Sequence, residues 1–140
     1  MADRNSGPDL AVTINDPAVV AEVRAAFFRY ESALVGNDIA TLDELFLEAP
    51  QTIRYGASEN LYGIEAIRAF RARRSATGLG RRLAQTQITT YGTDTAIAAT
   101  LFYRDNLPGR VGRQMQTWIR TPAGWRVAAA HVSIIDEPER

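Results

Sequence analysis

The chain has 140 residues, no cysteine and one histidine, and its 16 basic residues balance its 16 acidic residues. This length suits one domain with a single core, and the cysteine count excludes a disulfide framework, a thiolate nucleophile and cysteine-based metal sites. The neutral overall charge favours neither nucleic acid nor a membrane surface as a partner. No segment has the apolarity of a signal peptide or a membrane span, so we expect a cytoplasmic protein.

The first half of the chain has the pattern of helices interrupted by one short strand. Asn15-Asp16-Pro17 is typical of a helix start, with a capping side chain followed by proline. Apolar residues then recur at helical spacing until Gly36-Asn37, where either residue can take the left-handed conformation that ends a helix. We therefore expect, in order, a helix from Pro17, a short helix capped by Asp38, a strand over residues 52–55, a polar loop and turn over 57–63, and a helix over about 64–73.

From Arg81 the periodicity changes from helical to alternating. Four alternating segments joined by short turns are typical of an antiparallel meander. These segments cover residues 81–91, 95–104, 110–120 and 125–135. Helices followed by antiparallel strands indicate an α+β fold with the helices on one face of the sheet. We expect one domain over residues 14–136, between a flexible N-terminal tail at 1–13 and a C-terminal tail at 137–140.

Two polar side chains fall on apolar faces of the predicted helices. Tyr30 shares the arc of Val23 and Phe27 on the first helix. It is either a core tyrosine whose hydroxyl reaches solvent, or a proton or hydrogen-bond donor aimed into a pocket. Arg71 shares the face of Ile67 on the third helix, where it either pairs with a structural carboxylate or binds an anion. Neither helix carries an acid that obviously faces inward, which favours the anion-binding interpretation.

Arg54 lies between Ile53 and Tyr55 on the short strand, so its side chain points away from theirs. It faces a cavity if the two apolar neighbours pack outside, and solvent if they form the core. Alternation leaves both orientations open. We interpret the pair Arg81 and Arg82 as solvated surface.

The last strand contains the single histidine. Alternation places five residues on one face of this strand: Trp125, Val127, Ala129, His131 and Ser133. On the preceding strand Gln116 shares a face with Gln114 and Trp118, and we expect Gln116 and His131 to line one concavity. A lone histidine is more often structural than catalytic. The chain has no Ser-His-Asp arrangement, no phosphate-binding glycine loop and no metal-ligand spacing, so we expect neither a metal nor a cofactor.

The chain resembles the NTF2-like (SnoaL-like) superfamily in its order of elements and in the segments YESALVGNDIATLDELF, TIRYGASENLYGIEAIRAFR, GRQMQTWIR and GWRVAAAHVS. Between about Asn15 and Ser133 it resembles proteins of oxalurate catabolism and of cyanuric-acid breakdown, among them a decarboxylating amidohydrolase of 1,3-dicarboxyurea. The resemblance implies a cone-shaped α+β fold, in which N-terminal helices pack on a curved antiparallel sheet and enclose a pocket. It also implies a homodimer formed through the open face of the sheet.

The resemblance further implies a metal-independent amidohydrolase that acts on a carboxylated urea or on a related ureide such as oxalurate. Tyr30 and Arg54 match the tyrosine and arginine regarded as catalytic in the dicarboxyurea enzyme, which turns Arg54 toward the cavity. Arginine binds carboxylates through two parallel hydrogen bonds, which suits a small anionic substrate. We expect four further residues to contact that substrate: Arg71, Gln116, His131 and Ser133.

Two other functions fit parts of the pattern. The chain can be a non-catalytic accessory or ligand-binding subunit of a pathway amidase, which would use the same cavity and arginines. A proton shuttle of the ketosteroid-isomerase kind would need carboxylic acids beside the tyrosine in an apolar pocket. The expected cavity positions are instead arginine, glutamine and histidine, which favours small anions over steroids.

Overall fold

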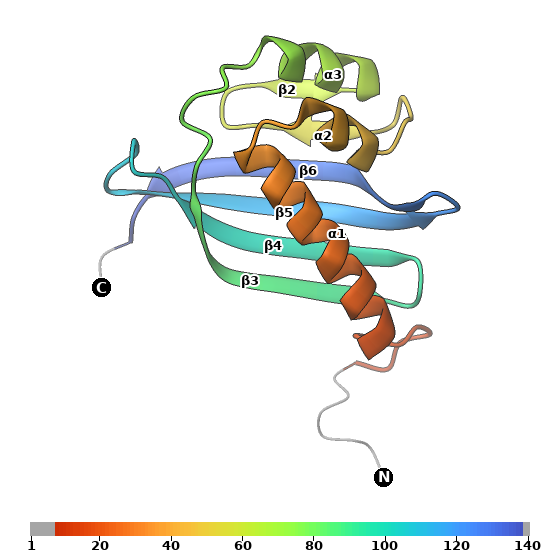
Figure 1. Cartoon of the computed structure of the whole chain (residues 1–140). Coiled ribbons are helices and arrows are strands. Elements are labelled where there is room, and N and C mark those ends of the chain that lie inside the picture. The colour runs from red at the N-terminus through yellow and green to blue at the C-terminus, as the bar shows by residue number, and fades with distance from the viewer. Residues whose placement is uncertain (1–7, 139–140) are drawn as a thin grey trace.

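The computed structural model describes residues 8–138, so residues 1–7 of the predicted N-terminal tail and 139–140 of the C-terminal tail lie outside the described residues (Figure 1). The helices are α1 (Pro17–Val35), α2 (Ile39–Leu45) and α3 (Ile64–Arg73). The strands are β1 (Ile53–Tyr55), β2 (Asn60–Tyr62), β3 (Arg82–Tyr91), β4 (Thr95–Tyr103), β5 (Arg110–Thr121) and β6 (Gly124–Asp136). Among the described helices, none is long and apolar enough to cross a membrane.

The limits of the first two helices follow from their capping residues. The Asp16 carboxylate accepts a hydrogen bond from the backbone N–H of Ala18 at 2.9 Å and so starts α1. Asn37, with a φ of 51°, takes the left-handed conformation just beyond the end of α1. Asp38 then caps α2 by accepting from the backbone N–H of Thr41 at 3.2 Å. The predicted starts of both helices are confirmed.

Six strands form one sheet in the order β2-β1-β6-β5-β4-β3. The long strands β3 to β6 pair antiparallel, as their alternating sequences predict. Two features differ from the expected antiparallel sheet. Strand β1 runs parallel to β6, and residues 60–62, expected in a loop and turn, form β2 against β1. A three-residue strand has too little alternation to be distinguished from a loop by its sequence.

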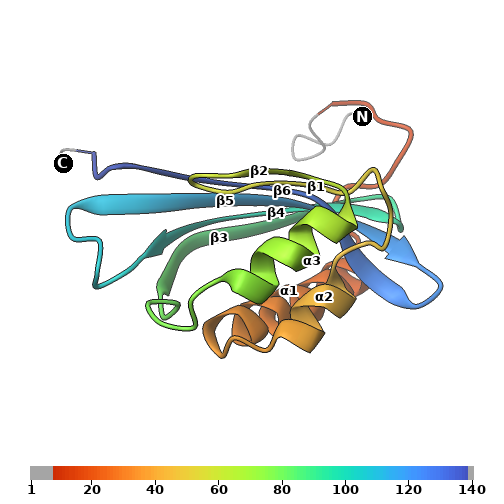
Figure 2. The same cartoon turned by 90° about the horizontal axis from the view of Figure 1, so that it is seen from above.

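All three helices lie on one face of the curved sheet, which confirms the predicted α+β architecture (Figure 2). The core fills the space between the two layers. Val23 and Phe27 of α1 are fully buried there, together with Trp118 of β5 and Val127 of β6. Around the C-terminal half of α1, the space between the layers is lined by both polar and apolar side chains, among them Tyr30 and Leu34.

Candidate functional site

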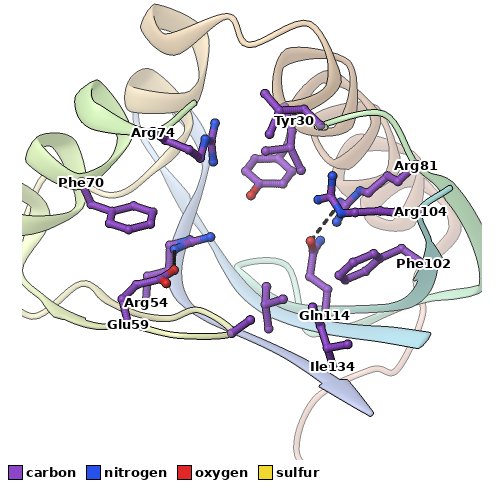
Figure 3. A pocket seen from close by; sticks show the side chains of 14 residues that line it. Tyr30, Arg54, Glu59, Phe70, Arg74, Arg81, Phe102, Arg104, Gln114 and Ile134 are labelled. Atoms are coloured by element: carbon purple, nitrogen blue, oxygen red, sulfur yellow. Dashed lines mark hydrogen bonds and ion pairs between the residues drawn. The ribbon is translucent and has the colours of Figure 1, made fainter. Parts of the chain in front are cut away.

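A cavity of about 160 Å³ lies between the helices and the inner face of the sheet (Figure 3). Its apolar wall includes Leu34, Phe70 and Phe102. Its polar side chains come from helices, strands and loops spread along the chain, namely Tyr30, Arg54, Glu59, Arg74, Arg81, Arg104 and Gln114. Four of these seven are arginines, so the cavity is built to attract anions.

Tyr30 lies at the centre of this cavity. Its side chain is only 4% exposed, and its ring lies 6.1 Å from that of Phe46 and 6.5 Å from that of Trp118. The hydroxyl points into the cavity (Figure 3). Of the two interpretations open from helical spacing, the structure shows the hydroxyl in a pocket, where it is placed to donate a hydrogen bond or a proton to a ligand.

Arg54 enters the cavity from β1. Its neighbours Ile53 and Tyr55 line a depression on the opposite face of the sheet, so alternation directs the guanidinium inward. The guanidinium lies 5.6 Å from the centre of the Phe70 ring, and its Nη1 donates to Glu59 Oε1 at 2.7 Å. A guanidinium has five N–H donors, so this contact leaves others for a ligand.

Glu59 stays ionised beside Arg54. Burial raises the pKa of this carboxyl, but hydrogen bonds from Arg54 and Ser58 outweigh burial and hold the pKa below its ordinary value. Gly56 makes this contact possible, because a Cβ at residue 56 would lie 1.6 Å from Glu59 Oε1. The carboxylate therefore occupies space that only glycine leaves free.

The prediction that Arg81 lies on the solvated surface is wrong. Its side chain is 1% exposed and its guanidinium forms a forked ion pair with Glu31, with Nε–Oε2 at 2.9 Å and Nη2–Oε1 at 2.5 Å. The same Nη2 donates to Gln114 Oε1 at 2.9 Å, and the guanidinium stacks 4.6 Å from the Phe102 ring centre. The partner lies 50 residues away, so no local pattern marks this arginine as buried. Its neighbour Arg82 is exposed, as expected.

Arg74 and Arg104 are half-buried and have no carboxylate partner within residues 8–138. Arg74 makes one long contact, from Nη2 to Asn37 Oδ1 at 3.5 Å, and its buried Nε has no partner. Arg104 donates to the backbone carbonyl of Gly78 at 2.6 Å. Burial lowers the pKa of both guanidinium groups. The neighbouring cations Arg71 and Arg54 lower the pKa of Arg74 further, and the neighbouring cation Arg81 lowers the pKa of Arg104 further. Neither residue was among those predicted to contact a substrate.

Arg71 lies outside the cavity, contrary to its expected contact with substrate. It is buried, at 3% exposure, and donates to Asp43 of α2 at 2.6 Å. Its guanidinium also lies 4.8 Å from the centre of the Phe46 ring. The sequence left two interpretations of Arg71 open, and the structure shows the structural ion pair. Its acid, Asp43, comes from α2.

His131 and Ser133 lie on the outer face of the sheet, away from Tyr30. In the pairing of β5 with β6, Trp118 is opposite Val127 but Thr117 is opposite Ala129, so Ala128 is an extra residue in the strand. Such a bulge reverses the alternation beyond it. Trp125 and Val127 therefore face the core, whereas the histidine and serine face outward; there the serine hydroxyl accepts from Arg113 Nε at 3.1 Å.

Gln116 and His131 do line one depression, but it is the one on the outer face, beside Tyr55 and Met115. The Gln116 side chain itself points inward, where its Oε1 accepts from Trp118 Nε1 at 3.1 Å. None of the three expected substrate contacts on β5 and β6 therefore reaches the cavity of Tyr30. Within residues 8–138, no group of three or more His, Cys, Asp or Glu side chains is arranged to hold a metal ion.

Residues 12–138 match the AtzH-like family. The chain is 58% identical to a protein of unknown function from the DUF3225 family of Pectobacterium atrosepticum SCRI1043, whose structure superposes with a TM-score of 0.86 over 88% of this chain and 95% of that one. It is 49% identical to a cystatin-like fold protein from Burkholderia xenovorans LB400, with a TM-score of 0.88 over 91% of this chain and 100% of that one.

An NTF2-like protein of unknown function from Pseudomonas putida KT2440 has the same fold at 17% identity, with a TM-score of 0.70 over 88% of this chain and 97% of that one. The fold is thus the NTF2-like, cystatin-like fold that the sequence resemblance implies. No curated protein matches the chain.

Proposed function

Since this chain belongs to the AtzH-like family, we propose that it is a decarboxylating amidohydrolase that acts on a carboxylated urea such as 1,3-dicarboxyurea, or on a related ureide such as oxalurate. The supporting observation is the cavity in which the Tyr30 hydroxyl faces the Arg54 guanidinium. These two residues match those that the family resemblance implies to be catalytic. The surrounding arginines favour a small anionic substrate.

For a carboxylated urea, the proposed reaction is the loss of an N-bound carboxyl group as CO₂; oxalurate has no carboxyl group on nitrogen and would not undergo this step. The C–N bond breaks and its electron pair stays on nitrogen, from where it is delocalised toward the urea carbonyl oxygen. Arg54 donates charge-assisted hydrogen bonds to that oxygen and stabilises its growing charge. Tyr30 protonates the nitrogen and regains its own proton from water. The net change is the uptake of one proton and the release of one CO₂.

The test is to incubate the purified protein with freshly generated 1,3-dicarboxyurea and with oxalurate, and to measure CO₂, ammonia and product. Tyr30→Phe should lower turnover by roughly 10²- to 10⁴-fold, the range typical of a general acid, while substrate still binds. Tyr91→Phe is the matched control, because Tyr91 lies on β3 outside the cavity. Unchanged turnover in Tyr30→Phe would remove the tyrosine from the chemistry. Ligand binding without any turnover by the wild-type protein would instead favour an accessory subunit of an amidase.

We also propose a homodimer formed through the outer face of the sheet. The depression on this face is lined by apolar side chains, including Ile53, Ile97 and Met115. Met115 is 54% exposed, and Tyr62 on the neighbouring edge is 62% exposed. Contiguous apolar surface of this kind is typical of protein–protein interfaces, and a second copy of the chain would bury it.

A further inference from the structure

The charges around the cavity do not cancel. Two of its four arginines have a carboxylate partner: Arg54 pairs with Glu59, and Arg81 pairs with Glu31. Among residues 8–138, Arg74 and Arg104 have no carboxylate partner. Arg74 contacts Asn37, and Arg104 donates to Gly78 and lies 5.3 Å from the centre of the Phe102 ring. Counted over residues 8–138, the cavity and its immediate partners therefore carry two positive charges in excess, one on Arg74 and one on Arg104.

We propose that Arg74 and Arg104 form two separate carboxylate-binding positions, which make the cavity selective for a ligand with a negative charge at each end. This proposal adds to the proposed function, and it rests on that function for the identity of the substrate.

The two guanidinium groups reach the cavity from opposite ends. Arg74 follows α3, which packs beside β1 and β2, whereas Arg104 follows β4. Strands β6 and β5 lie between β1 and β4 in the sheet, and neighbouring strands are about 4.8 Å apart, so β1 and β4 themselves are roughly 14 Å apart. The side chains of Arg74 and Arg104 extend toward each other from these two sides, near enough that the charge of Arg74 adds to the effect of burial and lowers the pKa of Arg104. Figure 3 shows Arg74 and Arg104 on either side of the Tyr30 hydroxyl.

A ligand held at both ends would place its middle at the catalytic pair. Dicarboxyurea has a carboxylate at each end and the urea carbonyl between them, so the carbonyl would lie near Tyr30 and Arg54 when both carboxylates are bound. The cavity of about 160 Å³ suits a ligand of this small size. A monoanion would leave one half-buried guanidinium without a carboxylate, and a neutral ligand would leave two.

Burial and the neighbouring cations explain why these two arginines favour an anion. Arg74 keeps a buried Nε without a partner, and such an unmade hydrogen bond is unfavourable. Both guanidinium groups are partly desolvated and lie near other arginines, which destabilises their charged forms. A carboxylate bound to each would remove both penalties.

The test compares two unreactive ligands of equal size by isothermal titration calorimetry. Glutarate has two terminal carboxylates on a five-atom chain, as dicarboxyurea has, and glutaramate replaces one of them by a neutral amide. We expect the wild-type protein to bind glutarate at least tenfold more tightly. Arg74→Gln and Arg104→Gln should each weaken glutarate binding by roughly tenfold to a hundredfold, the effect of losing a hydrogen bond to a charged group, and should reduce the preference over glutaramate to less than threefold.

Arg73→Gln is the matched control, because Arg73 is exposed and next to Arg74 but outside the cavity, and it should change neither affinity. Arg74→Lys and Arg104→Lys retain the charge and should keep most of the preference, which covers the case in which a glutamine variant fails to fold. Equal affinities for the two ligands in the wild-type protein, or an unchanged preference in either glutamine variant, would overturn the proposal.

The result is independent of the assay for turnover. A preference for glutarate without turnover of dicarboxyurea would keep the two carboxylate positions and refute the proposed reaction. Turnover of dicarboxyurea without any preference for glutarate would keep the reaction and refute these positions.

Discussion

Arg81 gives the clearest test of how the cavity wall is held together. Its guanidinium donates to both oxygens of Glu31 and to Gln114 Oε1, and its side chain is almost fully buried. The substitution Arg81→Met fills similar volume with an apolar chain and removes all three polar contacts. Glu31, itself 13% exposed, would then be a mostly buried carboxylate that has lost its ion-pair partner.

Removing one partner of a buried ion pair typically destabilises a protein by about 3–5 kcal/mol, because the other charge remains desolvated. That loss is a large part of the total stability of an ordinary domain, which is about 5–15 kcal/mol. Replacing both partners by apolar residues of similar volume removes the uncompensated charge and is often close to neutral. We therefore expect Arg81→Met to lower the free energy of unfolding by about 3 kcal/mol or more, and the double variant with Glu31→Met to recover most of it.

The measurement is urea-induced unfolding of the wild type, the two single variants and the double variant at neutral pH, with equal m-values as the check that the transitions are comparable. Arg82→Met is the control, because Arg82 is exposed and stacks 4.5 Å from the Tyr103 ring centre. It should cost about 1 kcal/mol or less. A loss below about 1 kcal/mol for Arg81→Met, or a double variant less stable than both singles, would refute the reasoning.

Three further predictions follow from the other contacts. Arg71→Gln should lower the free energy of unfolding by a few kcal/mol, because it removes the cation that pairs with Asp43. It should change the KM for substrate by no more than about twofold, whereas a large rise in KM would show that Arg71 contacts the substrate. The contact with Arg54 holds the folded-state pKa of Glu59 below the ordinary 4.5, so this contact stabilises the fold fully above pH 4.5 and less as the pH falls through the lower folded-state value. Glu59→Gln should therefore destabilise the protein at pH 7 and make less difference at low pH. Urea unfolding of both proteins from pH 7 to pH 3.5 measures this difference, and a difference that does not vary with pH would contradict the prediction. Met115→Glu should place a charge in the proposed dimer interface and halve the mass measured by light scattering, whereas an unchanged mass would argue against this interface.

Most of the fold was predictable because its signals are local. The capping carboxylates of Asp16 and Asp38 are adjacent in sequence to the helices that they start. The long strands alternate over nine or more residues each, enough for the period of two to be unambiguous. Tyr30 shares helical spacing with apolar residues, so the inward direction of its side chain was predicted, and the pocket around its hydroxyl was one of two alternatives.

The residues that were misplaced depend on contacts between distant segments. Whether an arginine such as Arg71 or Arg81 is buried depends on an acid that the fold brings to it, here Asp43 and Glu31, and neither pairing has a signature in the sequence. The reversal of His131 depends on one extra residue in β6, which strict alternation does not include. Alternation was reliable within each segment of β6 and failed only across the bulge.

The close approach of Glu59 to Gly56 links the charge of the cavity to a residue that carries no charge. Any side chain at residue 56 would force the Glu59 carboxylate to shift and would weaken its contact with Arg54. A single added methyl group at this position would then leave more of the Arg54 donors for a ligand, while the number of ionisable residues around the cavity stayed the same. The residue at position 56 thus controls how strongly Arg54 is held by its own carboxylate, and hence how freely it can bind an anion, without any substitution of an arginine.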